Sequence, residues 1–328
     1  MKRVGIIYGG KSGEHDVSLC SAASVVEYID KDKFEVIAIG IDRDGQWYLQ
    51  DSVIIEDDKD FGKKLAIDKE NKCLVEHFPL DDTFRVYSIN NKNVTSVDVV
   101  FPVMHGTNCE DGAVQGLFEL SSVPYVGAEV LGSAIGIDKD VSKRLLKEAH
   151  IPVVPWRTVD KYSWLENREE VIKEINWQFN PPFFVKPNSA GSSVGVIKVK
   201  QYDDIGAALD ESFKYDIRLL IENAINAREI ECAVLGNENP RVSIPGEIRS
   251  HHDFYSYEAK YIDSEGAELI IPAELSDLLN KEILQSAVRA YGVLNCMGMA
   301  RIDFFVDKEN DEYYLNEINT LPGFTSVS

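Results

Sequence analysis

The sequence predicts an N-terminal α/β domain built on a parallel sheet, followed by one or two α+β lobes. Three observations support this prediction. Apolar runs at residues 3–8, 34–41 and 97–103 alternate with segments of helical spacing, which is typical of a parallel sheet covered by helices. Beyond about residue 150, strand-like runs outnumber helical ones. The length of 328 residues suits two or three domains.

The elements of the first domain follow from local patterns. Its first strand ends in Gly9-Gly10, a pair typical of a tight turn. Helices are expected at residues 16–29, where apolar side chains recur at helical spacing, and from Ala113 onward. The segment 51–93 is charged, and we expect an irregular peripheral insertion there. Residues 127–136 form the predicted exit from the domain.

A basic helix is predicted at residues 138–150, and Ile151-Pro152 ends it. The rest of the chain is richer in strands. Strands are predicted at residues 153–159, 183–187, 195–200, 217–222, 229–235, 241–248, 299–306 and 312–319. Helices are predicted at about residues 165–175, 202–214 and 275–292.

The composition excludes several classes of protein. With 34 basic and 55 acidic residues, the chain carries a formal net charge of −21. This argues against a general binder of nucleic acid or of anionic membranes, because both need a basic face. No stretch reaches the ~20 apolar residues that span a bilayer, and the first apolar run is too short for a secretory signal. Five scattered cysteines without a CxxC pair indicate reduced thiols, so we expect a cytoplasmic protein.

One motif match is coincidental. Residues 5–12, GIIYGGKS, satisfy the P-loop pattern GxxxxGK[ST]. That loop needs a strand before it and a helix directly after it. Here Ile6, Ile7 and Tyr8 are themselves strand residues, and the predicted helix starts only near Asp16. A strand ending in a glycine turn is the better interpretation.

Lys186 stands at the end of an apolar strand and is followed at once by the loop NSAGSSVG, residues 188–195. A lysine in this place is either a surface residue or a phosphate ligand. The small loop offers amide and hydroxyl groups that suit a phosphate cover, although a merely flexible loop would have a similar composition. The two features together favour a phosphate site.

Acidic residues interrupt two apolar strands near the C-terminal end. The turn signal DKEND in MARIDFFVDKENDEYYLNEINT predicts a hairpin centred near Asn310. In that register Asp303 lies opposite Glu317, and Arg301 lies opposite Asn319. Two carboxylates and an amide oxygen on one face suit Mg²⁺ bound together with substrate phosphates. A solvated acidic face is the alternative in so acidic a chain.

A third pattern lies in the sequence between the loop after Lys186 and the acidic strands. Residues 219–225, LLIENAI, and Glu229 form a strand, a short connection and an acidic residue. Such a connection can hold an adenine edge through backbone groups, with Glu229 on the ribose hydroxyls. On its own the pattern is not specific.

These motifs together resemble a known superfamily. Asp138-Lys139, KPNSAGSSVG, LLIEN…REIE, ARIDFF and NEINTLPGFTS occur in the order typical of ATP-grasp enzymes. GGKSGEHDVSL, HGTNCEDGAVQG and YEAKY make the chain similar to D-alanine–D-alanine ligases and their D-Ala–D-Ser and D-Ala–D-lactate relatives. The resemblance covers essentially the whole chain. It implies a Rossmann-like domain over residues 1–127, a central ATP-grasp lobe over 128–222, and a C-terminal ATP-grasp lobe with the metal site and a lid loop over 223–328.

The resemblance also implies roles for individual residues. The implied nucleotide contacts are Lys139 and Lys186 at the phosphates, Ser193 in the closing loop, Glu222 and Ile225 at the adenine, Glu229 at the ribose, and Lys260 at the γ-phosphate. The implied magnesium ligands are Asp303, Glu317 and Asn319. Arg301 and the backbone of Gly323 would stabilise an acyl phosphate. The implied substrate contacts are Glu14 and His105 at the first D-alanine and Ser328 at the second, while Glu14, Ser192 and Tyr261 would orient the closing loop.

The implied activity is the ATP-dependent joining of two D-alanines through an acyl phosphate, for peptidoglycan precursor synthesis. It implies ATP and Mg²⁺ (or Mn²⁺) as cofactors, D-alanine as substrate and a homodimer. The alternative is a D-Ala–D-Ser, or less readily a D-Ala–D-lactate, ligase of the vancomycin-resistance type. Tyr261 favours an amine acceptor, because the D-lactate relatives tend to carry phenylalanine there, whereas Val327 departs from a histidine common in relatives. A non-catalytic nucleotide binder would be expected to lack the metal ligands.

Overall fold

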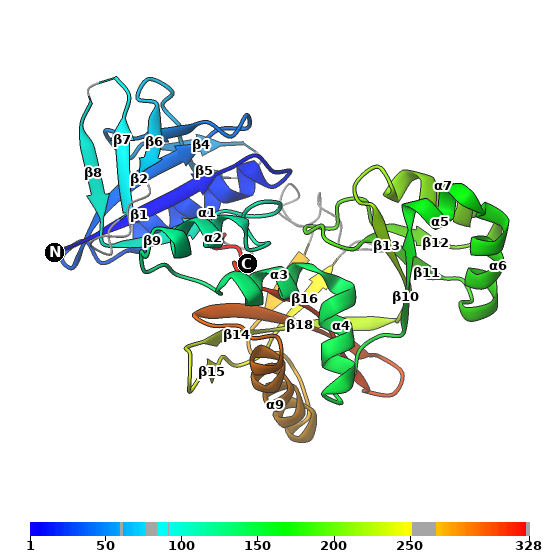
Figure 1. Ribbon diagram of the computed structural model, residues 1–328. Helices are drawn as coiled ribbons and strands as arrows, with labels where there is room; N and C mark the ends of the chain where they lie inside the picture. Colours follow the sequence, from blue (N-terminus) through cyan, green and yellow to red (C-terminus); the bar gives the residue numbers. More distant parts are fainter. Residues whose placement is uncertain (60–61, 77–83, 91, 251–266, 326–328) are drawn as a thin grey trace.

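The computed structural model describes residues 1–59, 62–76, 84–90, 92–250 and 267–325 (Figure 1). Within these ranges the chain forms three larger sheets, of four, four and six strands, and two small ones. Figure 1 shows the N-terminal sheet on one side, the central sheet on the other, and the C-terminal sheet with α9 below them. No helix in the described ranges is long and apolar enough to cross a bilayer.

The N-terminal sheet has the strand order β3-β2-β1-β9. β1, β2 and β9 run parallel, and β3 adds an antiparallel edge. Apolar side chains of β1 alternate between two faces, so that Ile6 packs on α1 and Ile7 packs on the α2 side. The bounds are β1 (Lys2–Gly9), α1 (His15–Tyr28), β2 (Phe34–Ile41), β3 (Trp47–Leu49), β9 (Val99–Val103) and α2 (Ala113–Leu120). A parallel sheet with a helix on each face confirms the predicted α/β domain.

The segment 51–93 contains strands, contrary to the prediction of an irregular insertion. β4 pairs with β5, and β7 pairs with β6 and β8. Phe84 of β7 is buried, and its ring packs edge-on against Phe118 of α2 at 5.7 Å. The bounds are β4 (Ile55–Asp58), β5 (Gly62–Leu65), β6 (Cys73–Glu76), β7 (Phe84–Ser88) and β8 (Val94–Val97). Strands of four or five residues show too few alternations to stand out among charged residues.

Two helices lead from the first domain into the rest of the chain. α3 (Val130–Ile137) occupies the segment that was predicted only as an exit. Its glycines permit a close approach, since a Cβ on Gly132 would lie 2.5 Å from the carbonyl oxygen of Asn295. α4 (Lys139–Glu148) confirms the basic helix. The side chain of Asp138 caps it by accepting a hydrogen bond from the amide of Val141.

The central lobe is an antiparallel sheet with the order β10-β13-β11-β12. Its apolar side chains, with Phe183 and Leu219 fully buried, form one core with Trp164 and the helices on that face. The bounds are β10 (Trp156–Asp160), α5 (Lys161–Glu166), α6 (Arg168–Gln178), β11 (Phe183–Pro187), β12 (Ile197–Val199), η1 (Tyr202–Asp204), α7 (Ile205–Ser212) and β13 (Arg218–Asn223). The predicted strands are confirmed, and the helix expected near residues 165–175 is divided into α5 and α6.

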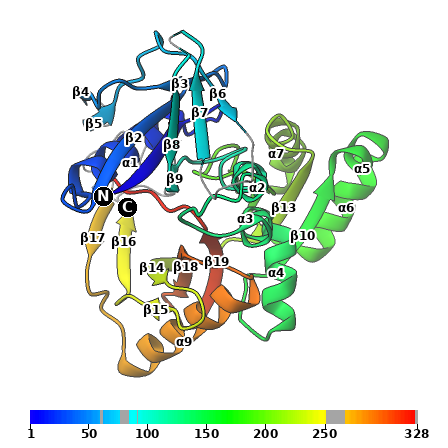
Figure 2. The same cartoon turned by 60° about the vertical axis from the view of Figure 1, so that its left-hand side comes forward.

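The C-terminal lobe is a sheet with the order β17-β16-β14-β18-β19, and β15 pairs with β14. One face buries Ile230, Ile302 and Leu315 against α9 and against Leu146 of α4. Figure 2 shows this sheet beneath the N-terminal domain, with α9 on its outer side. The bounds are β14 (Ala227–Leu235), β15 (Arg241–Val242), β16 (Gly246–Ser250), β17 (Ala267–Ile270), α9 (Asp277–Val293), β18 (Met299–Asp307) and β19 (Tyr313–Asn319). The single strand predicted at 241–248 is therefore two strands, and β17 was not predicted.

Candidate active site

A cleft of about 730 Å³ separates the central sheet from the C-terminal sheet. Its walls come from β11 and β13 on one side and from β14, β16, β18 and β19 on the other. Eight residues that were singled out from the sequence line this cleft: Lys139, Lys186, Ser192, Ser193, Glu222, Ile225, Glu229 and Glu317. The fold therefore gathers them from four strands, one helix and two connecting segments.

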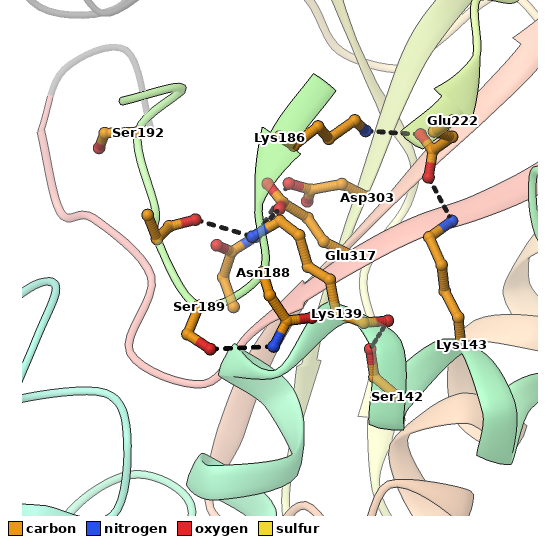
Figure 3. Close-up of polar contacts among 12 residues, drawn as sticks. Lys139, Ser142, Lys143, Lys186, Asn188, Ser189, Ser192, Glu222, Asp303 and Glu317 are labelled. Atoms are coloured by element: carbon orange, nitrogen blue, oxygen red, sulfur yellow. Dashed lines mark hydrogen bonds and ion pairs between the residues drawn. The ribbon is translucent and has the colours of Figure 1, made fainter. Parts of the chain in front are cut away.

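Lys139 and Lys186 reach the cleft from different elements (Figure 3). Lys139 is the first residue of α4, and its Nζ donates a hydrogen bond to the carbonyl oxygen of Ala190 at 2.8 Å. The same Nζ lies 3.5 Å from Oε2 of Glu317. Lys186, in β11, donates to Oε1 of Glu222 at 2.5 Å. Six Lys or Arg and five Glu side chains line the cleft, so it is slightly positive although the chain as a whole is acidic. The ammonium groups can bind the oxygens of a polyphosphate.

The loop that follows β11 is tied to the start of α4. The carbonyl oxygen of Asn188 accepts a hydrogen bond from the amide of Lys139, and its Oδ1 accepts one from the amide of Asp140. Both amides belong to the helix N-terminus, where no intrahelical acceptor exists. Ser192 and Ser193 have positive φ angles of 49° and 58°. Because such conformations are costly for residues other than glycine, they concentrate at loops that serve a binding site.

Glu222 lies between two lysines, and one of them, Lys143, was not found by sequence reasoning. Oε2 of Glu222 lies 2.7 Å from Nζ of Lys143, and both side chains are 1% exposed. Burial alone would raise the pKa of Glu222, but Lys143 and Lys186 outweigh burial and hold that pKa below its usual value. The signal that could have found Lys143 is its spacing of four residues from Lys139, which places both lysines on one helix face.

The acidic hairpin has the predicted register. Asp303 pairs with Glu317, and Arg301 pairs with Asn319, across β18 and β19. The guanidinium group of Arg301 donates two hydrogen bonds of 2.8 Å to the carboxylate of Asp303. Nε of Arg301 also lies 3.2 Å from Glu231, a third carboxylate, in β14, that sequence reasoning missed. The alternation of REIEC in β14 could have indicated Glu231, because Glu229 and Glu231 share one face.

The hairpin offers the oxygen donors that a hard divalent cation prefers. Asp303 and Glu317 supply carboxylates, and Asn319 supplies an amide whose Nδ2 donates to Asp303 at 2.9 Å. In the described part of the chain, no three His, Cys, Asp or Glu side chains are arranged as a self-sufficient metal site. The donor set therefore fits a cation that takes its remaining ligands from phosphates and water, as Mg²⁺ does.

The remaining predicted residues lie in the N-terminal domain, in the acidic hairpin, near the C-terminal end or outside the described ranges. Ser192 donates a hydrogen bond to the buried carboxylate of Glu14. His105 is buried beside Ser21 and the carbonyl oxygen of Leu321.

Gly323 lines a separate apolar cavity of about 970 Å³ next to α1. Arg301, Asp303 and Asn319 do not line the cleft, but Asp303 pairs with Glu317, which does. Lys260, Tyr261, Val327 and Ser328 lie outside the described residues, as does most of the expected lid at 250–261.

Two lobes with antiparallel sheets hold a cationic cleft between them, with a small-residue loop on one wall and an acidic hairpin on the other. This arrangement defines an ATP-grasp enzyme. Comparison with models of known protein families identifies the family within this class. The family model described as "D-ala D-ala ligase N-terminus" matches residues 3–128, and "D-ala D-ala ligase C-terminus" matches residues 145–328. The chain belongs to the D-alanine–D-alanine ligase family.

Individual relatives agree with the family models. The chain is 46% identical over 328 residues to a D-alanine–D-alanine ligase of Shouchella clausii, covering 100% of this chain and 88% of that protein. It is 43% identical to D-alanine–D-alanine ligase A of Escherichia coli K12, covering 99% and 88%. Among solved structures, the VanG D-Ala:D-Ser ligase of Enterococcus faecalis has a TM-score of 0.83 at 36% identity, covering 100% and 92%. The D-alanine–D-alanine ligase of Coxiella burnetii has a TM-score of 0.81 at 35% identity, covering 100% and 86%.

Proposed function

We propose that this protein joins two D-alanine molecules to D-alanyl-D-alanine at the expense of ATP, as a step in peptidoglycan precursor synthesis. Relatives named D-alanine–D-alanine ligase, at 43–46% identity over the full chain, support this proposal. The observation that carries it is the placement of Lys139 and Lys186 in one cleft with Glu317 of the acidic hairpin. A nucleotide triphosphate and its cation need this pairing of charges.

The proposed reaction has two steps. The carboxylate of the first D-alanine attacks the γ-phosphorus of ATP, which forms an acyl phosphate and releases ADP. The amine of the second D-alanine then attacks the acyl carbon, and inorganic phosphate leaves. Neither step needs a covalent bond to the protein, so the residues position the reactants and neutralise developing negative charge.

The roles proposed for individual residues in these steps are those that the family resemblance implies. Lys139 and Lys186 would hold phosphate oxygens, and the loop with Ser192 and Ser193 would cover them. Glu222 and Ile225 would contact adenine, and Glu229 the ribose. Asp303, Glu317 and Asn319 would hold Mg²⁺ or Mn²⁺, which neutralises phosphate charge when bound. Arg301 and the backbone of Gly323 would stabilise the acyl phosphate, while Glu14 and His105 would hold the first D-alanine.

Further parts of the proposal concern residues outside the described ranges and the state of the protein in the cell. Lys260 would reach the γ-phosphate from a lid, Tyr261 would join Glu14 and Ser192, and Ser328 would receive the second carboxylate. A closed lid excludes water, which would otherwise hydrolyse the acyl phosphate. We also propose a cytoplasmic homodimer, which light scattering of the purified protein would test.

A D-Ala–D-Ser ligase is the second candidate. The observation that favours it is the similarity to VanG, with a TM-score of 0.83 over the whole chain. The sequence relatives favour D-alanine as the acceptor, because those at 43–46% identity over the full chain are named D-alanine–D-alanine ligase.

The deciding experiment measures phosphate release from Mg·ATP with D-alanine alone, then with equimolar D-serine or D-lactate, and identifies the products by mass spectrometry. We expect release that requires D-alanine and a product mixture dominated by D-Ala-D-Ala. A dominant mixed product would establish the second candidate. Release that does not respond to any D-amino acid would refute both.

A further inference from the structure

Lys143 is buried behind the cleft and has no role in the proposed reaction. Figure 3 shows it on α4, with its ammonium group directed at Glu222. One oxygen of Glu222 lies 2.7 Å from Lys143, and the other lies 2.5 Å from Lys186. One buried carboxylate therefore joins two lysines.

The two lysines differ in what they can reach. Lys186 is 12% exposed and lines the cleft, whereas Lys143 is 1% exposed and does not line it. The Trp156 ring lies 5.8 Å from the ammonium group of Lys143 and helps to enclose it. Lys186 can therefore turn toward a ligand, but Lys143 must stay with Glu222.

This difference matters because Glu222 competes with a phosphate for Lys186. A buried carboxylate that loses its only cationic partner is strongly destabilised, so a carboxylate paired with Lys186 alone would hold that lysine back. Lys143 supplies a second ammonium group, which stays beside Glu222. Lys186 can then move to a phosphate while Glu222 stays neutralised.

The titration behaviour of the cluster agrees with this charge pattern. Burial lowers the pKa of Lys143 below its usual value, and the nearby carboxylate of Glu222 reduces this shift without cancelling it. The two lysines together keep the pKa of Glu222 low, so the carboxylate remains ionised. Two cations and one anion leave an excess positive charge, and Lys186 is the member that faces the cleft.

We propose that Lys143 is a positioning residue that neutralises Glu222 and thereby frees Lys186 to bind the phosphates of the nucleotide. The inference rests on the proposed function, because it requires a phosphate-bearing ligand in the cleft. On this proposal, loss of Lys143 weakens the binding of phosphate groups. A lysine that only stabilised the fold would affect the free energy of unfolding and not phosphate binding.

The test compares ADP with adenosine, because only ADP carries phosphates for Lys186. Lys143→Met keeps the length of the side chain and removes its charge. We expect calorimetric titration to show ADP binding weakened roughly tenfold, as for loss of one charge-assisted contact, with adenosine binding unchanged. Thermal unfolding verifies that the variant is folded. Lys143→Gln serves the same comparison if the methionine variant does not fold.

Two further variants complete the design. Lys147→Met is the control. Lys147 is an exposed lysine of the same helix, and its ammonium group also lies 5.8 Å from the Trp156 ring, so its replacement should leave the affinities for ADP and for adenosine unchanged. Because Glu222 is itself proposed to contact adenine, the double variant K143M/E222Q is compared with E222Q alone. With the competing carboxylate removed, loss of Lys143 should no longer change the ratio of ADP to adenosine affinity. An unchanged ratio in folded K143M, or an equal loss of ADP and adenosine binding, would overturn the inference. Failure of the unaltered protein to bind ADP would instead refute the proposed function.

Discussion

Ser192 donates a hydrogen bond to the carboxylate of Glu14, 178 residues earlier in the chain. Glu14 directly precedes α1 in the N-terminal domain, and Ser192 belongs to the loop after β11. A Cβ on Gly191 would lie only 3.0 Å from Oε2 of Glu14, so the loop packs closely on this carboxylate. The contact links the domain proposed to hold the first D-alanine to the loop proposed to cover the phosphates.

The first prediction concerns this link. Ser192→Ala removes one hydrogen bond to an ionised group, which is worth about 1.5–3 kcal/mol. We expect kcat/KM for D-alanine to fall about 10- to 100-fold, because the loop no longer closes against Glu14. Steady-state assays of phosphate release measure the change. Ser189→Ala, at an exposed position of the same loop, is the matched control, and an equal loss in both variants would contradict the prediction.

The second prediction concerns the acidic hairpin. Asp303→Asn removes a charged oxygen donor and one partner of Arg301. We expect turnover to fall about 10²- to 10³-fold, as for other groups that stabilise developing charge, and a higher Mg²⁺ concentration to be needed. Chelation of divalent cations should abolish turnover in the unaltered protein. Glu309→Gln, in the exposed turn of the same hairpin, should behave normally. An unchanged Mg²⁺ requirement in D303N would place the cation elsewhere.

The hairpin shows how far sequence reasoning can reach. The turn signal and strand alternation were sufficient to pair Asp303 with Glu317, and the structure confirms this pair. The same register fails closer to the turn, since a bulge after Asp303 pairs Phe304 with Leu315 instead of Asn316. The bulge breaks the alternation of β19, in which the buried side chains of Leu315 and Ile318 are three residues apart instead of two. This irregular spacing is the sign of the bulge in the sequence, and a register counted from the turn alone does not take it into account.

Lys143 and α3 show where the local pattern is insufficient, because the spacing places Lys143 on the helix face of Lys139 but does not show that Lys143 is buried. Lys143 stands in a basic helix, where lysines are ordinarily exposed. Only the packing of Glu222 and Trp156 around it makes it a buried charge. The two glycines of α3 lower its helix propensity, but they are what lets it approach the C-terminal lobe. In both cases tertiary contacts outweigh the local pattern.

The third prediction is a pH dependence of stability. Burial would lower the pKa of His105, but Glu110, Glu14 and the carbonyl oxygen of Leu321 outweigh burial and raise it. Protonated His105 therefore stabilises the fold below the unfolded pKa of about 6.5, and this contribution is lost as pH rises through the folded pKa. Each pKa unit corresponds to about 1.4 kcal/mol.

His105→Gln should remove this pH dependence. Unfolding midpoints of both proteins, measured between about pH 5 and pH 9, should differ most at low pH and converge as pH rises. A constant difference across the range would show that His105 stabilises the fold by packing alone.

The last prediction concerns the junction between the N-terminal domain and the C-terminal lobe. Gly298 has a φ of +70°, and a Cβ there would lie 2.5 Å from the carbonyl oxygen of Gly127. Gly298→Ala should lower the free energy of unfolding by about 2–4 kcal/mol, because a forced backbone shift adds to the cost of a left-handed alanine. Gly292→Ala is the matched control, since its Cβ would meet no atom within 4 Å and alanine favours α9 by up to about 1 kcal/mol. Urea unfolding should therefore shift the two midpoints in opposite directions, and a rise in both midpoints would show that Gly127 can move away from Gly298 at little cost.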